Sequence, residues 1–377
     1  MTDWSLIGVD PDKILQRLRD PALVPVGTKF FAGSRLDLQD GLTCLQTFDL
    51  LGLGSLALAV KRLRFGNRAF YVVNQHLNYT NVCVNACRFC AFHRAPGSAQ
   101  GYLMTPEEAT ERVAPAAQNG LKEVHVVGGI NPEPEFSYYF ELLQALKMTA
   151  PRVGLKAFTA VEIDHIANRA GVSWKECLTA LKDAGLNALP GGGAEVFSPR
   201  VRAELFPSKI SAETWLGVHG TAHRLGIGSN ATLLFGHIET HSERIEHLLK
   251  LRNQQDETGG FRAFIPLAFQ SRTTLMADKP GPTGVDILKM MATSRLMLDN
   301  IPHIKAYWVM LGRKTAQAAL HFGADDVEGT IVNEQIAHEA GATTAVGLSR
   351  EEVHELISEA GAEPTERDTF HRGVGAA

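Results

Sequence analysis

The chain has 377 residues, of which 45% are hydrophobic and 21% charged, and its formal net charge is −4. These are ordinary values for a globular protein, and without a basic surplus we expect a small-molecule partner and no nucleic acid. The N-terminal sequence lacks a basic start followed by a long apolar run, and no later stretch offers about 18 uninterrupted apolar residues. We therefore expect a cytoplasmic protein that has no membrane partner.

The predicted elements alternate along the chain. Residues 1–67 contain a helical run at 34–53 and are expected to form an N-terminal extension. From residue 68 onward, apolar or β-branched runs predict eight strands, at 69–74, 123–129, 155–162, 186–195, 229–236, 261–269, 304–311 and 327–332.

Helices are predicted between the strands, because cap residues there precede a glutamate by three positions. These pairs are Thr105 with Glu108, Ser173 with Glu176, Thr240 with Glu243, and Ser349 with Glu352. A strand–helix rhythm of this length predicts an α/β fold with a parallel (β/α)8 barrel of the TIM type over residues 68–345. Residues 346–377 are expected to form a small C-terminal appendage.

Three of the five cysteines, Cys83, Cys87 and Cys90, lie within NVCVNACRFCAFH directly after the first predicted strand. Loops after strands form the catalytic face of a parallel barrel. With His93, the cysteines could make a Cys3His zinc site, although structural zinc usually stabilises small modules and a fold of this size needs none. An iron–sulfur cube takes one thiolate per iron, so three cysteines would leave one iron open to a substrate.

The Cys-x3-Cys-x2-Cys spacing, with the aromatic Phe89 before the last cysteine, resembles that of the radical S-adenosylmethionine (SAM) superfamily. Longer stretches look like the menaquinone-pathway enzymes of the futalosine route, among them HLNYTNVCVNACRFCAFHR, HVVGGINPEP, LPGGGAEVFSPRVR and SRLMLDNIPHIKAYWVMLGRKTAQAALHFGADDVEGT. The resemblance extends from about residue 5 to residue 345. FFAGSRLDLQDGLTCL and IPLAF are more similar to aminofutalosine synthase than to the cyclase that acts on dehypoxanthinyl futalosine.

This resemblance implies a [4Fe-4S] cluster held by Cys83, Cys87 and Cys90, with SAM as a consumed cosubstrate. It implies that the 5'-deoxyadenosyl radical adds to the vinyl carbon of 3-[(1-carboxyvinyl)oxy]benzoate, and that rearrangement and loss of carbon dioxide give 6-amino-6-deoxyfutalosine. A reducing donor such as flavodoxin or ferredoxin is also implied. Three alternatives stay open: the hydrogen-abstracting cyclase, a non-enzymatic zinc-containing barrel, and a module that merely binds SAM.

Other candidate residues follow predicted strands. Gly128 and Gly129 end the second strand, where glycine lets the backbone approach the methionine part of SAM, although glycine also marks simple turns. Glu162 is predicted to end the third strand and Glu195 to follow the fourth, both facing the catalytic side. The resemblance makes Glu195 a candidate for the ribose or amino group of SAM. The glycines at 191–193 are expected to approach SAM closely, since no phosphate-binding motif follows them.

Several further residues are given simpler interpretations. Asn230, Thr232, His237 and Glu239 lie along the fifth strand and its exit, but HIETH is not the HExxH pattern of zinc proteases, so no second metal is expected. Thr240 is interpreted as a helix cap and His241 as a first-turn surface residue. The two carboxylates of the implied substrate need cations, for which Arg88 and Arg94 are candidates, although loop arginines are commonly solvated. Cys44 and Cys177 are expected to be buried free thiols.

Overall fold

The computed structural model describes Trp4 and residues 8–373. Its strands are β1 (Arg68–Val72), β2 (Asn74–Leu77), β3 (Glu123–Val126), β4 (Gly154–Ala157), β5 (Ala188–Leu189), β6 (Gly228–Phe235), β7 (Phe261–Ala268), β8 (His303–Ile304), β9 (Asp326–Gly329) and β10 (Glu363–Glu366). Strands β2 to β8 form one parallel sheet in chain order, and β10, β1 and β9 form a second sheet.

Isolated bridges join the two sheets into a ring. Lys305, just after β8, pairs with Asp326 of β9, and Gln75 of β2 pairs with Val332 beyond β9. Strands β1 and β2 are the two halves of one strand interrupted at Val73, so β9 closes the ring between β8 and the first strand. The expected α/β fold with a parallel barrel is thus confirmed.

The helices are α1 (Pro11–Gln16), α2 (Leu23–Phe31), α3 (Leu38–Gln46), α4 (Leu50–Phe65), α5 (Pro106–Gln118), α6 (Phe136–Thr149), α7 (Ala160–Ala170), α8 (Trp174–Asp183), α9 (Pro199–Leu205), α10 (Ala212–Arg224), α11 (His241–Thr258), α12 (Gly284–Met297), α13 (Trp308–Leu311), α14 (Arg313–Ala319), α15 (Ile336–Glu339) and α16 (Arg350–Glu359). The four predicted capping boxes are all present, at the starts of α5, α8, α11 and α16. None of the described helices is long and apolar enough to cross a membrane.

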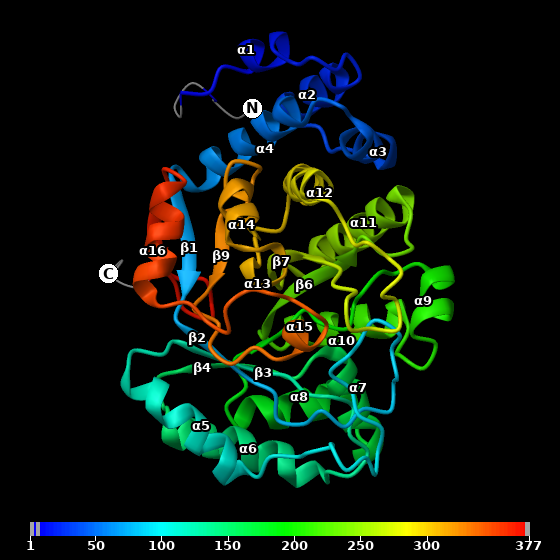
Figure 1. Cartoon of the computed structure of the whole chain (residues 1–377), viewed down its shortest axis with the longest axis vertical. Coiled ribbons are helices and arrows are strands. Elements are labelled where there is room, and N and C mark those ends of the chain that lie inside the picture. Colours follow the sequence, from blue (N-terminus) through cyan, green and yellow to red (C-terminus); the bar gives the residue numbers. More distant parts are fainter. Residues whose placement is uncertain (1–3, 5–7, 374–377) are drawn as a thin grey trace.

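Both ends of the chain pack on the barrel (Figure 1). Helix α4 packs against α12, and α3 against α11 and α12, so the helices before β1 cover one end of the molecule. The single helical run predicted at 34–53 is divided into α3 and α4, because Asp49 caps a new helix through the backbone N–H of Gly52. At the other terminus, β10 extends β1 with parallel pairing and α16 packs on it.

Several predicted strands are shorter than expected. The third ends at Ala157, because Thr159 and Glu162 form a capping box that starts α7. The fourth has only two residues, 188–189, and the rest of 186–195 is loop. The last four residues of 304–311 form α13, since an apolar run buried on all sides does not distinguish a strand from a helix.

The amino-terminal end of the barrel contains buried ion pairs. Lys156 lies 2.6 Å from Glu123 and 3.2 Å from Glu328, and Lys305 lies 2.7 Å from Glu328. Arg367, next to β10, pairs with Asp326 at 2.5 Å. Each charge is therefore matched by an opposite one, as burial in a low dielectric requires.

Candidate active site

The cysteines lie on a loop that is closed at its base. The backbone N–H of Cys83 donates to the carbonyl of Arg94 at 2.9 Å, and that of Arg94 donates to the carbonyl of Asn81 at 2.8 Å. The Thr80 hydroxyl donates to the carbonyl of Tyr102 at 2.6 Å. These bonds fix both ends of the segment that carries Cys83, Cys87 and Cys90.

All three cysteine side chains line one pocket at the carboxyl end of the barrel. Burial raises the pKa of the Cys87 thiol to about 12 and also raises the pKa of Cys90. Without a cation these thiols stay neutral, whereas a metal ligand must be a thiolate, so the positive charge of bound iron is what would ionise them.

The arrangement of the cysteines fits a cluster better than a single metal ion. His93, the fourth ligand of the zinc alternative, has its Nδ1 within 2.8 Å of the Cys90 carbonyl oxygen, to which it can donate. Three thiols placed around a shared space suit a group that takes one thiolate per iron.

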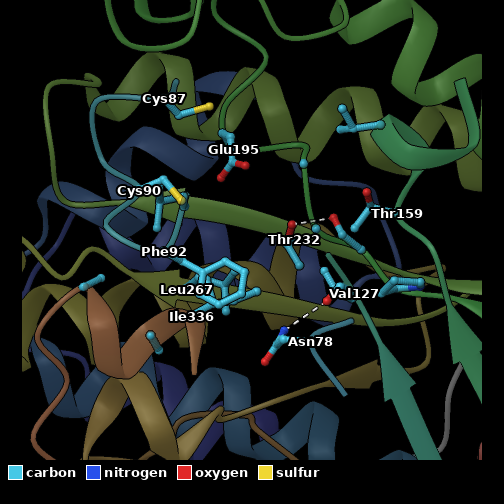
Figure 2. A pocket seen from close by; sticks show the side chains of 18 of the residues that line it. Asn78, Cys87, Cys90, Phe92, Val127, Thr159, Glu195, Thr232, Leu267 and Ile336 are labelled. Atoms are coloured by element: carbon cyan, nitrogen blue, oxygen red, sulfur yellow. Dashed lines mark hydrogen bonds between the residues drawn. The ribbon is translucent and has the colours of Figure 1, made fainter. Parts of the chain in front are cut away.

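Glu195 and Lys209 form an ion pair, and Figure 2 shows the Glu195 carboxylate near Cys87 and Cys90. Their charged atoms are 2.6 Å apart, and both side chains are only 11% exposed. Burial lowers the pKa of Lys209, but the Glu195 carboxylate more than compensates and raises it above its usual value. The ammonium also lies 5.6 Å from the centre of the Phe89 ring, within cation–π range. Glu195, Lys209 and Phe89 therefore form one group of interacting side chains beside the cysteine loop.

Gly128 and Gly129 line the pocket, but they lie in the loop after β3, which ends at Val126, and not in the strand as predicted. A Cβ on Gly129 would come within 2.2 Å of the Val82 carbonyl oxygen, and one on Gly128 within 2.7 Å of the Tyr79 ring. Glycine is therefore required here for close packing against the cysteine loop.

Glu162 does not lie where the sequence suggested. It is in the first turn of α7, is 1% exposed and is not among the pocket-lining residues. Its carboxylate accepts four hydrogen bonds, from the Tyr79 hydroxyl, the Gly128 N–H, and the N–H and hydroxyl of Thr159. Burial raises its pKa to about 7. The expectation that Glu162 faces the catalytic side is wrong. Its carboxylate lies behind the pocket wall and stabilises that wall through these hydrogen bonds.

The glycines at 191–193 and the fifth predicted strand, which is β6, form another part of the pocket wall. A Cβ on Gly191 would come within 2.8 Å of the backbone of Ala231, so this loop lies directly against β6. The Thr232 hydroxyl donates to the Gly191 carbonyl at 2.7 Å. Asn230 and Thr232 both line the pocket, because alternate residues of β6 share a face.

The other candidates lie elsewhere. His237 and Glu239 pair with each other at 3.0 Å outside the pocket, and Thr240 caps α11 as expected. Arg94 donates to carbonyls of its own loop and pairs with Glu339, while Arg88 is exposed. Neither arginine lines the pocket. Cys44 and Cys177 are buried free thiols, as expected.

Sequence analysis missed the pocket's other cations and polar groups. Lys209 comes from the connection between α9 and α10, where no motif marks it. His76, His125 and Lys156 come from the interior of strands β2, β3 and β4 and lie deeper in the same pocket, whose volume is about 300 Å³. Strand alternation shows which residues of a strand share a face. It does not say which face points into the barrel, so alternation alone could not have identified these residues.

Comparisons with known proteins agree with this geometry. Residues 77–251 match the radical SAM superfamily, and residues 258–372 match the CofH/MqnC C-terminal region. The barrel is similar to the crystal structure of methylornithine synthase (PylB), with a TM-score of 0.72 and 20% identity over 90% of this chain and 97% of that one.

Three curated relatives match over most of their lengths. The aminodeoxyfutalosine synthase of Thermus thermophilus is 45% identical over 96% of this chain and 98% of its own. The 5-amino-6-(D-ribitylamino)uracil–L-tyrosine 4-hydroxyphenyl transferase of Methanopyrus kandleri is 42% identical, covering 82% and 85%. The cyclic dehypoxanthine futalosine synthase of Streptomyces coelicolor is 36% identical, covering 93% and 88%.

The parallel barrel and its cysteine loop define the class, that of the radical SAM enzymes, which use a [4Fe-4S] cluster and SAM. Within that superfamily, the chain belongs to the family of the aminodeoxyfutalosine synthases.

Proposed function

We propose that this chain joins the 5'-deoxyadenosyl group of SAM to the vinyl carbon of 3-[(1-carboxyvinyl)oxy]benzoate and forms 6-amino-6-deoxyfutalosine with release of carbon dioxide. One electron is taken in to cleave the sulfonium and one is given up as the carboxylate leaves as carbon dioxide, so the reaction needs no net reductant. When bound, the cluster held by the three cysteines would supply the electron that cleaves the sulfonium and would accept the electron released on decarboxylation.

One observation supports this proposal above the others. A single pocket combines three cysteine thiols at its mouth with room for a second molecule deeper in the barrel. This pocket occurs in a chain that is 45% identical, over 96% of its length, to an aminodeoxyfutalosine synthase. The 36% identity to the cyclic dehypoxanthine futalosine synthase is lower, over a similar share of the chain.

The residues at the mouth take distinct roles in this proposal. Cys83, Cys87 and Cys90 bind the cluster, one thiolate to each of three irons. The Glu195 carboxylate accepts hydrogen bonds from the polar groups of SAM, and Lys209 orients that carboxylate. Phe89 packs edge-on against Phe206 and shields the cluster loop.

The barrel wall holds the acceptor and excludes water. Leu234, Ile265, Leu267 and Phe269 line the pocket from β6, β7 and the loop after β7. An apolar wall protects a carbon radical from side reactions, and fixed placement of two reactants raises their effective concentration to about 10^5 M or more.

A low-potential protein such as flavodoxin or ferredoxin delivers the first electron. The chain works in the reducing cytoplasm, which suits its five free thiols.

The test follows the adenosyl label. The reconstituted enzyme is incubated without oxygen with dithionite, adenosine-labelled SAM and the enolpyruvyl benzoate, and the mixture is analysed by mass spectrometry. We expect the label in an adenosyl adduct that has lost carbon dioxide. Stoichiometric release of labelled 5'-deoxyadenosine without an adduct would overturn the proposal and favour a hydrogen-abstracting enzyme such as the cyclase.

A further inference from the structure

The floor of the pocket carries a row of basic side chains. His76 of β2 pairs in register with His125 of β3, and His125 pairs in register with Lys156 of β4. Residues paired across parallel strands lie at one level of the barrel, and all three line the pocket. The two imidazole rings are 4.5 Å apart between centres. This level lies within the strands, below the cysteine loop that follows β2.

Polar atoms at this level, and one of Asn78 just above it, lack hydrogen-bond partners. In the part of the chain that the structure describes, none is found for His76 Nε2, for either ring nitrogen of His125, or for Asn78 Oδ1. Asn78 uses its amide nitrogen on the Val127 carbonyl at 3.0 Å, which leaves its oxygen free (Figure 2). Buried polar groups are nearly always satisfied, so a group of orphaned atoms around one cavity indicates a polar ligand.

The fixed charges around the floor are already balanced. Lys156 is paired with Glu123 and Glu328, and Glu334 accepts from the Ala337 N–H and pairs with His338. In the described part of the chain, none of these carboxylates is hydrogen-bonded to His76 Nε2 or to His125, although Glu334 is near enough to His76 to favour its charged form. Burial lowers the pKa of His76 and lowers that of His125 well below its usual value, so each ring has one N–H to donate.

Part of the opposite wall of the pocket is apolar, although Asn230 and Thr232 of β6 also line the pocket. The apolar part is formed by side chains of β6, β7 and the loop after β7, namely Leu234, Ile265, Leu267 and Phe269. A molecule that fits between the walls needs a flat apolar body and a polar group on one edge. An aromatic ring that carries a carboxylate meets this description.

We propose that His76 and His125 bind the ring carboxylate of the aryl substrate at the pocket floor and thereby position its vinyl group toward the cysteine loop. The inference rests on the proposed function, because the substrate defined there has two carboxylates. The one on the ring is farther from the vinyl carbon, so it is the one that reaches the floor when the vinyl carbon faces SAM. His76 and His125 are thus positioning residues that act on substrate orientation.

The first test changes the ligand and leaves the protein intact. Binding of 3-[(1-carboxyvinyl)oxy]benzoate and of 2-phenoxyacrylate, which lacks the ring carboxylate, is measured by calorimetry on the anaerobic holoenzyme with SAM and no reductant. We expect 2-phenoxyacrylate to bind about tenfold or more weakly, the difference made by one charge-assisted hydrogen bond or more. Equal affinity for the two compounds would overturn the inference.

The second test changes the protein. His125→Gln and His76→Asn are expected to weaken binding of the enolpyruvyl benzoate about tenfold, and to change binding of 2-phenoxyacrylate little. They should also raise KM more than they lower kcat, and release more 5'-deoxyadenosine per adduct. His241→Gln, outside the pocket on α11, is the matched control.

The outcomes separate this inference from the proposed function. If the unmutated enzyme forms the adenosyl adduct, but the variants lose affinity for both compounds equally, only the floor assignment is wrong. If the unmutated enzyme binds neither compound and forms no adduct, the proposed function fails and the floor assignment fails with it.

Discussion

The ion pair of Glu195 and Lys209 is the residue-scale feature that most affects the chemistry at the mouth. Its charges are 2.6 Å apart and largely buried, in a loop where Glu195 has a backbone φ of 48°. The Leu234 N–H donates to the Glu195 carbonyl at 2.9 Å and holds this left-handed conformation in place. The carboxylate is therefore fixed from both its backbone and its side chain.

Glu195→Gln should weaken SAM binding and uncouple the reaction. The amide offers Lys209 and SAM a weaker acceptor, so we expect the Kd for SAM to rise about tenfold. A loosely held adenosyl group should also yield more 5'-deoxyadenosine relative to adduct. Anaerobic equilibrium dialysis and product analysis measure both effects. Glu204→Gln, an exposed residue of α9, is the control, and an unchanged Kd in Glu195→Gln would contradict the assignment.

Replacing any one cluster cysteine should remove the cluster. Cys87→Ala leaves one iron without its thiolate, so we expect the variant to retain little iron and to cleave no SAM after reconstitution. Cys177→Ala should keep about four irons per chain, because Cys177 is a buried core thiol of α8. Iron, sulfide and zinc analysis checks this, and one zinc per chain with full occupancy in Cys87→Ala would defeat the cluster assignment.

At the scale of elements, the segment around α15 covers part of the pocket. Ile336 and Ala337 line the pocket, and Arg94 of the cysteine loop pairs with Glu339 at 3.3 Å. The segment is anchored by His338, whose Nδ1 lies 2.9 Å from a Glu334 carboxylate oxygen and whose Nε2 lies 3.1 Å from the Thr344 carbonyl oxygen. The hydrogen bond with Glu334 raises the pKa of His338 to about 9.

This anchor should weaken at alkaline pH. Because the folded-state pKa is raised from 6.5, the stabilisation from charged His338 is complete below about pH 6.5 and is lost as the pH rises through about 9. The nearby Tyr102, whose pKa burial raises to about 12, stays neutral over this range. We expect hydrogen exchange of residues 335–345, corrected for intrinsic rates, to accelerate between pH 7 and about 9.5. His338→Gln should show no such step, and identical profiles for the two proteins would refute the anchor.

In the molecule as a whole, the segments outside the barrel are part of the same folded structure as the barrel. We propose residues 1–67, 68–345 and 346–377 as N-terminal extension, barrel and C-terminal appendage that unfold together. The C-terminal part supports this, because β10 pairs with β1, and Arg367 places a fully buried guanidinium against Asp326 of β9. The appendage thus supplies a charge that the barrel interior requires.

Arg367→Met should destabilise the whole barrel. It leaves Asp326 without its 2.5 Å partner and Glu328 without a cation 4.0 Å away, and breaking a buried pair costs about 3–5 kcal/mol. Urea denaturation should show one transition shifted by this amount. Arg372→Met, which removes an exposed pair with Asp368, should change the free energy of unfolding by less than about 1 kcal/mol. A separate transition for the C-terminal part would contradict a single unfolding unit.

Features that depend on near neighbours in the chain could be predicted from the amino-acid sequence. The cysteine spacing, the four capping boxes and the strand–helix order are local patterns, and each predicted its element or its chemistry. The capping box of Thr159 and Glu162 was equally local, and reading it would have put Glu162 in a helix. Contacts between residues that are far apart in the chain could not be predicted in this way, because they depend on how the barrel closes. Lys209 reaches Glu195, and His76 aligns with His125, because barrel closure and strand register bring together side chains whose separation in sequence carries no such signal.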